Sequence, residues 1–130
     1  MEKIDIVKGY GRTADGFAKV LDYNKALEIH TQALSIYERE LLKIEYPVYE
    51  AVLYMNIGLS YKNISNYDKA LKFFGKSLVI YQKEGLEYSF DAAKLYNNIG
   101  EVYQEMGEPN KALEMHEKAL SIQTKEEAKI

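Results

Sequence analysis

The sequence has no cysteine, no tryptophan and only two prolines among its 130 residues. Without cysteine, the chain has no disulfide, no thiolate nucleophile and no cysteine-ligated zinc. A reducing compartment is consistent with this composition, and we expect a cytoplasmic protein. Because Pro47 and Pro109 lie far apart in the chain, long helices can run between them.

The sequence also has no large excess of either charge, because it contains 17 basic and 20 acidic residues, for a net charge of −3. Such a chain has no overall positive field that would attract nucleic acid or an anionic membrane. No apolar run approaches the roughly 18 residues of a membrane span, and the first residues lack the apolar core of a signal peptide. We therefore expect a soluble protein with neither nucleic-acid nor membrane partners.

The chain does contain an internal repeat. Residues 51–80 align with residues 93–122 without a gap, at an offset of 42. The matched pairs include Tyr54 with Tyr96, Asn56 with Asn98, Ile57 with Ile99, Gly58 with Gly100, Tyr61 with Tyr103, Ala70 with Ala112, Leu71 with Leu113 and Leu78 with Leu120. A weaker first copy lies 44 residues before the second, through Ala26, Leu27, Ala33, Leu34 and Ile36. We expect one domain over 1–130, with repeats at 8–46, 47–88 and 89–126.

Each repeat shows helical spacing in two segments, because Tyr54, Ile57, Gly58 and Tyr61 fall at i, i+3, i+4 and i+7, and a second such series follows a break. The breaks carry capping residues, namely Asp22, Ser65-Asn66 and the sequence Gly107-Glu108-Pro109. This predicts an all-α fold of three stacked helix-turn-helix repeats. The expected helices are 2–20, 23–44, 48–64, 67–84, 89–106 and 109–126.

Small residues recur at matching positions of the repeats. Gly58 and Gly100 each cost about 1 kcal/mol of helix propensity relative to alanine. Close packing of two helix axes is the expected compensation, with tyrosine and leucine side chains filling the flanking grooves. A lone helix pair cannot bury its apolar face, so the repeats should stack.

With these residues assigned, the chain resembles the tetratricopeptide repeat (TPR) family, whose motif has an aromatic residue, a Leu-Gly-like pair and a tyrosine on the first helix, then Ala, Phe and Ala on the second. The matches are Tyr54, Ile57-Gly58, Tyr61, Ala70, Phe74 and Ser77, and then Tyr96, Ile99-Gly100, Tyr103, Ala112, His116 and Ala119. The first copy departs from the motif at Thr13-Ala14, and His30 and His116 replace the phenylalanine. The period near 42 is similar to the long-repeat variety of kinesin light chains and Pins/LGN-type adaptors.

This resemblance implies a right-handed superhelix, an α-α solenoid whose concave groove binds a peptide or helix of a partner protein. It implies a non-catalytic adaptor or scaffold, with no cofactor and no metal. The groove candidates are the first-helix residues outside the packing stripe: Met55, Asn56, Leu59, Lys62, Asn63, Lys94, Asn97, Asn98, Glu101 and Gln104. Asn56 and Asn98 are the strongest, because an amide can both donate to and accept from a peptide backbone. The alternative is that they are solvated or bond a neighbouring helix.

Repeats that clamp the C-terminal carboxylate of chaperones use five cationic and amide residues. This chain is similar at Asn56 and Lys94 only, since Gly11, Asp15 and Asn98 occupy the other three places. We therefore expect no terminal-carboxylate ligand, and the charge of Asp15 would repel one.

Other functional interpretations are weaker. His30 and His116 occupy the same repeat position two layers apart, on the order of 20 Å, so they cannot share a metal and are expected to pack in place of phenylalanine. The glycine-rich segment 9–16 lacks a Gly-Lys-Ser/Thr ending, so it predicts a weak first helix and no nucleotide site. No nucleophile and base stand at a catalytic spacing, which argues against a hydrolytic or metal-dependent enzyme.

Self-association is the main alternative function. The sequence after Ile122 shows no additional polar helix that would cover the last repeat, although the open ends of solenoids usually need one. An uncovered end would pair with a second copy or with further repeats of a larger TPR scaffold.

Overall fold

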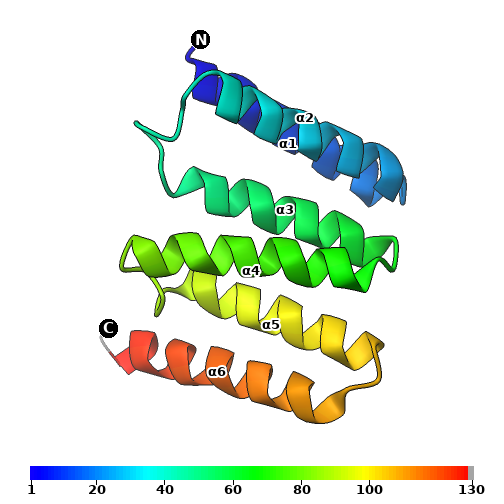
Figure 1. Ribbon diagram of the computed structural model, residues 1–130, viewed down its shortest axis with the longest axis vertical. Coiled ribbons are helices and arrows are strands. Elements are labelled where there is room, and N and C mark those ends of the chain that lie inside the picture. The colour runs from blue at the N-terminus through cyan, green and yellow to red at the C-terminus, as the bar shows by residue number, and fades with distance from the viewer. Residues whose placement is uncertain (129–130) are drawn as a thin grey trace.

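The computed structural model describes the backbone of residues 1–128 and the side chains of residues 1–125, and the only regular elements in the described backbone are α-helices. Figure 1 shows them stacked one after another from the N-terminus to the C-terminus. The helices are α1 (Lys3–Lys19), α2 (Tyr23–Arg39), α3 (Tyr49–Asn63), α4 (Tyr67–Lys83), α5 (Phe90–Glu105) and α6 (Pro109–Ala128). The predicted all-α repeat fold is confirmed.

The six helices form three pairs. Most of the tertiary contacts join α1 to α2, α3 to α4 and α5 to α6. Contacts of α2 with α3 and of α4 with α5 then join one pair to the next, which is the sequential stacking seen in Figure 1. The first helices of the second and third pairs, α3 and α5, also contact each other directly.

The second helix of each pair begins where the sequence predicts. The Asp22 side chain accepts a hydrogen bond from the Lys25 amide at 3.2 Å, and the Asn66 side chain accepts from the Lys69 amide at 3.4 Å. Pro109 is the first residue of α6 and follows Gly107, whose φ is +77°. These caps satisfy backbone donors that a helix leaves free at its start, which fixes the turn within each pair.

The predicted end of the second helix at residue 44 is wrong, because α2 ends at Arg39. Leu41 takes the left-handed conformation with φ of 55°, and the Leu42 amide donates back to the Tyr37 carbonyl at 3.1 Å. The matching turn in the next repeat has Gly85, with φ of 71°. A glycine there would have marked the end of α2, whereas the apolar residues Leu41, Leu42 and Ile44 extended the helical pattern past it.

The other predicted boundaries agree with the structure to within two residues. The connection 40–48 between α2 and α3 is longer than the connection 84–89 between α4 and α5, which accounts for the unequal repeat offsets. The α1 helix runs without interruption through Gly9, Gly11 and Gly16.

The largest core cluster lies between the second and third pairs. It contains buried residues of α3, α4 and α5: Ala51, Ala70, Phe74, Tyr81, Leu95, Ile99 and Val102. Within it, Gly58 lies against the Phe74 ring, and a Cβ at residue 58 would be 2.7 Å from two ring carbons. In the third pair a Cβ at Gly100 would be 2.8 Å from the His116 imidazole. The predicted close approach at both glycines is confirmed.

The tyrosines of the first helices are less buried than those at the ends of the second helices. Tyr37 and Tyr81, at the ends of the second helices, are almost completely buried. The Tyr37 hydroxyl donates to the Tyr46 carbonyl at 2.7 Å, which ties α2 to the connection that follows it, and burial raises the pKa of Tyr37 to about 12. Tyr54 and Tyr96, which the spacing placed in the core, are half-buried, and Tyr10 is 36% exposed.

The two histidines occupy the phenylalanine position in different ways. His30 is 4% exposed, and its Nδ1 has no hydrogen-bond partner among the described side chains of residues 1–125. Its Nε2 lies 3.6 Å from an Asp15 carboxylate oxygen. Burial lowers the pKa of His30, and the charge of Asp15 opposes that change. His116 is half-buried, with its Nδ1 3.0 Å from the Asn97 side-chain oxygen.

A first prediction concerns the glycine contact. We expect Gly58→Ala to lower the free energy of unfolding by about 1–3 kcal/mol, the usual cost of over-packing a core, even though alanine favours a helix. Gly75→Ala is the matched control, because a Cβ at Gly75 in α4 meets nothing within 4 Å. We expect Gly75→Ala to raise stability by about 0.5–1 kcal/mol. Urea unfolding of both variants checks this, and equal effects would contradict the close approach.

We expect the stability of the fold to depend on pH through His30. The unfolded chain takes up a proton at His30 near pH 6.5, whereas burial resists it in the folded chain. The unfolded state therefore binds more protons in this range, so stability is complete above about pH 6.5 and falls as the pH drops below it.

We expect the wild type to lose more stability than His30→Phe in urea unfolding between about pH 7.5 and about pH 5.5. Phenylalanine does not titrate, and because Ala14 stands at the position that Gly58 holds opposite Phe74, the variants are compared by their pH dependence and not by their absolute stability. Asp15→Asn should enlarge the loss, since it removes the charge that opposes the lowered pKa. Equal losses in the wild type and His30→Phe would exclude this role for His30.

Candidate functional site

The two predicted amides lie on neighbouring first helices. Asn56 is on α3 and Asn98 is on α5, and these helices contact each other. Both side chains are half-buried, and neither makes a side-chain hydrogen bond within residues 1–125. Their donors and acceptors are therefore available to a ligand or to water.

An ion pair crosses the same surface. The Lys62 ammonium at the end of α3 contacts the Glu101 carboxylate of α5. The Lys62 side chain is 21% exposed and that of Glu101 is 49% exposed. This pair joins the two first helices directly and places one charge of each sign beside the amides.

Further predicted residues share a face of α5 with Asn98. Lys94, Asn98 and Glu101 are spaced i, i+4 and i+7, so their side chains follow one stripe of the helix. Lys94, Glu101 and Gln104 are exposed. On α3, Asn63 is exposed and lies seven residues after Asn56, which places it on the same side of the helix.

The remaining three predicted residues have partners inside the fold. Met55 and Leu59 are partly buried and pack against the core cluster of the second and third pairs. The Asn97 oxygen lies 3.0 Å from His116 of α6, so this amide is engaged within its own helix pair. These three side chains are therefore engaged inside the fold, unlike the amides of Asn56 and Asn98.

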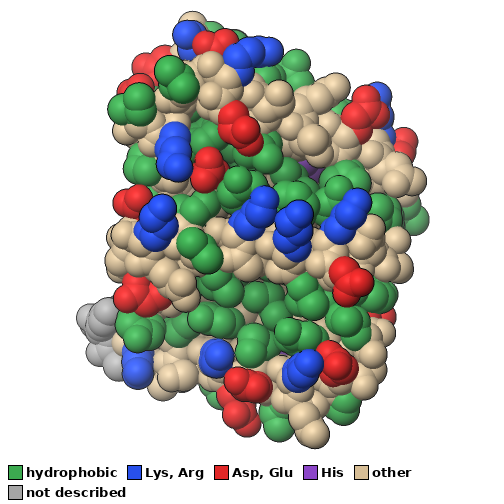
Figure 2. Space-filling view, in the orientation of Figure 1, with side chains coloured by type: hydrophobic (Ala, Val, Ile, Leu, Met, Phe, Trp, Pro, Cys, Tyr) green, Lys and Arg blue, Asp and Glu red, His purple; other side chains and the backbone are tan. Residues whose placement is uncertain are grey.

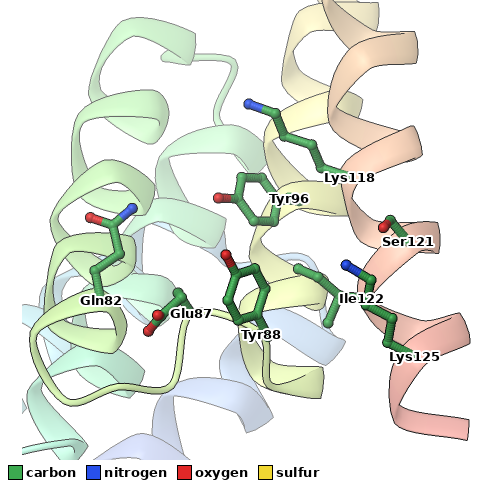
Figure 3. A pocket seen from close by; sticks show the side chains of 8 residues that line it. All are labelled: Gln82, Glu87, Tyr88, Tyr96, Lys118, Ser121, Ile122 and Lys125. Carbon is green, nitrogen blue, oxygen red and sulfur yellow. The ribbon is translucent and has the colours of Figure 1, made fainter. Parts of the chain in front are cut away.

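The structure also has hollows that the sequence did not predict. One, of about 390 Å³, is lined by residues of α4, α5, α6 and the α4–α5 connection, shown in Figure 3: Gln82, Glu87, Tyr88, Tyr96, Lys118, Ser121, Ile122 and Lys125. A similar hollow of about 300 Å³ occurs one repeat earlier, where Tyr54, Lys76, Ile80 and Lys83 take the places of Tyr96, Lys118, Ile122 and Lys125. The sequence signal that could have predicted the two hollows is a pair of lysines seven residues apart, which recurs on α4 and α6.

Among the described residues, no three His, Cys, Asp or Glu side chains gather as ligands for a metal ion. Within the same part of the chain, every helix is too short or too polar to cross a membrane.

Comparison with known proteins agrees with this geometry. The helix pairs and their stacking define a helical-repeat solenoid. The family model described as Tetratricopeptide repeat matches residues 49–125, which include the second and third pairs. The chain belongs to the tetratricopeptide repeat family. No curated protein matches the sequence.

Several solved structures share the fold. The TPR domain of Arabidopsis FLU is 19% identical, with a TM-score of 0.78, and the match covers 92% of this chain and 96% of that one. BtubC (BKLC) from P. vanneervenii is 24% identical, with a TM-score of 0.82 over 96% of this chain and 48% of that one. The second TPR of Spaghetti (RPAP3), bound to the HSP90 peptide SRMEEVD, is 19% identical, with a TM-score of 0.66 over 89% of this chain and 91% of that one.

Proposed function

We propose that this chain is a non-catalytic protein-interaction module that binds a peptide or helix of a partner over the first helices α3 and α5. The observation that carries the proposal is the pair of half-buried amides, Asn56 and Asn98, at matching positions of two first helices in contact. Such amides can bond a peptide backbone whatever its side chains are. The Lys62–Glu101 pair beside them would help select the partner's charges.

A peptide-bound relative supports the class of ligand. The second TPR of Spaghetti is bound to an HSP90 peptide. The ligand of this chain should differ from a terminal carboxylate, because Gly11 and Asn98 stand where such a clamp has cations and the negative charge of Asp15 would repel a carboxylate. An internal segment of a partner protein is the better fit.

The proposal extends to the subfamily, the domain organisation and the cellular location of the chain. We place the chain in the long-repeat variety similar to kinesin light chains and Pins/LGN-type adaptors, on the 42-residue offset of its second and third repeats. One domain over 1–130, a cytoplasmic location and a scaffold or adaptor role are consistent with the absence of cysteine and with the family.

Self-association is a second candidate function, and exposed leucines favour it. Leu71 and Leu78 of α4 are partly buried against the core that includes α5. The matching residues of α6, Leu113 and Leu120, are 58% and 63% exposed. A second copy or a further repeat packed on α6 would cover them as α5 covers their counterparts.

The groove is tested by Asn56→Ala combined with Asn98→Ala. We expect the tightest ligands from a fluorescein-labelled peptide library to bind the double variant about tenfold or more weakly, because each lost hydrogen bond costs about 1 kcal/mol. Fluorescence anisotropy measures the affinities. Asn24→Ala with Asn110→Ala is the matched control, since both residues are exposed near the start of second helices. Unchanged affinity of the ligands for the variant with Asn56→Ala and Asn98→Ala would count against this groove.

Assembly is tested by Leu113→Gln combined with Leu120→Gln. If α6 pairs with another copy, light scattering of the wild type should show a mass that rises with concentration, and the double variant should stay monomeric because its apolar contact is removed. Leu41→Gln with Ile44→Gln changes two apolar residues that are exposed outside α6 and should leave the assembly unchanged. A wild type that is monomeric at high concentration would remove self-association.

A further inference from the structure

Helix α4 carries a row of lysines on one side. Lys69, Lys72, Lys76 and Lys83 are all exposed, and their spacing confines them to about 60° of the helix circumference. The only acidic residue within α4 is Asp68. Figure 2 shows lysine side chains in a row over α4, with hydrophobic side chains on both sides of the row.

The charge of this row is specific to the second repeat. Where α4 has Lys72, α2 has Glu28 and α6 has Glu114. Glu28 lies 3.5 Å from Lys25, and Glu114 lies 3.7 Å from Lys118, so each glutamate offsets a lysine of its own helix. Among the described side chains, those of residues 1–125, none of the four lysines of α4 forms an ion pair.

Aromatic rings lie under the lysines. Phe73 stacks on Tyr61 with ring centroids 5.6 Å apart, and its centroid is 6.0 Å from that of Tyr54. The Lys69 ammonium is 5.4 Å from the Tyr61 centroid, and the Lys76 ammonium is 5.2 Å from the Phe73 centroid. The negative ring faces attract the ammonium groups and hold them near this strip.

The 300 Å³ hollow lies at one end of the row. Lys76, Lys83 and Lys43 line it together with the acidic residues Glu50 and Glu84. Its apolar side chains are Tyr54, Pro47, Ile80 and Val79, of which Val79 is 52% exposed. The hollow therefore offers an apolar site beside a small excess of positive charge.

This surface is separate from the groove proposed above. Asn56 follows Tyr54 by two residues, which turns its side chain about 200° around the axis of α3. Tyr54 of the aromatic strip and Asn56 of the groove consequently lie on opposite sides of α3.

We propose that the lysine row and the adjoining hollow bind an acidic, extended segment of a partner protein. From Lys69 to Lys83 the row is about 21 Å long, which an extended chain spans in six or seven residues. Alternate residues of such a chain are about 6.6 Å apart, close to the rise of about 6 Å between Lys72 and Lys76. Acidic residues at alternate positions face the lysines, and a large apolar residue beyond them enters the hollow.

The chemistry favours a peptide over a nucleic acid. The chain as a whole has a net charge of −3, which repels a long polyanion but leaves a local row free to bind a short acidic segment. The rings of the strip are also covered by lysines and by one another, so they do not offer open faces on which bases stack.

The test uses fluorescence anisotropy with a fluorescein-labelled peptide of about eight residues, sized by the length of the row, with glutamates at alternate positions followed by leucine. The reference peptide has glutamine in place of each glutamate. We expect the acidic peptide to bind more tightly and its affinity to fall between about 0.05 M and about 0.5 M salt, because exposed charges are screened.

Lys72→Glu recreates the residue of the other two repeats, and we expect it to weaken the acidic peptide about tenfold. Lys94→Glu makes the same charge change in the groove proposed over α3 and α5, and a peptide that is bound by the lysine row should keep its affinity within about twofold. Lys69→Gln combined with Lys72→Gln and Lys76→Gln keeps side-chain length over the rings and should also weaken binding. Circular dichroism confirms that each variant folds.

Three results would overturn this proposal. Equal binding of the glutamate and glutamine peptides removes the role of charge. A loss caused by Lys94→Glu and not by Lys72→Glu assigns the acidic peptide to the groove over α3 and α5. A single-stranded oligouridylate of equal charge that binds more tightly than the peptide identifies the row as a nucleic-acid site.

Discussion

The close approach of α3 to α4 at Gly58 is the contact on which the second repeat depends. With no Cβ at residue 58, the Phe74 ring lies directly against the backbone of α3. The same ring is part of the core cluster that α5 completes through Leu95 and Ile99. A shift of this ring would therefore be felt in two helix pairs at once, because tightly packed interiors transmit changes in volume.

Much of the fold could be predicted because the sequence signals that define each repeat act over a few neighbouring residues. Caps at Asp22 and Asn66, the glycine at residue 107 and the spacing of small residues each act over a few positions, and the structure has all of them. The end of α2 was missed because Leu41 adopts a left-handed conformation that leucine rarely takes. Its cause is tertiary, since Leu42 must turn back to reach the core beside Tyr37.

The site was harder to predict, because helical spacing assigns a residue to a side of a helix and not to a partner. Asn56 and Asn97 are both asparagines of first helices, and their spacing places both outside the packing stripe. Asn97 nevertheless bonds His116 within its own helix pair, whereas Asn56 makes no such bond among the described residues. Tyr54 was assigned to the core by its spacing, and it lines a surface hollow instead. Which of two similar side chains stays available depends on what the neighbouring helix places opposite it, and the sequence of one helix does not contain that information.

The three repeats keep one architecture while their surfaces differ. At the position of Lys72 the other repeats carry glutamates that offset their own lysines, so only α4 presents an uncompensated row. Exposed ion pairs contribute little to stability, about 0–1 kcal/mol each, so exchanging one of these glutamates for lysine alters the surface charge at little cost to folding. A solenoid can in this way give each repeat a separate binding chemistry, because the contacts that hold the helices together lie at Gly58 and Phe74, away from the exposed row.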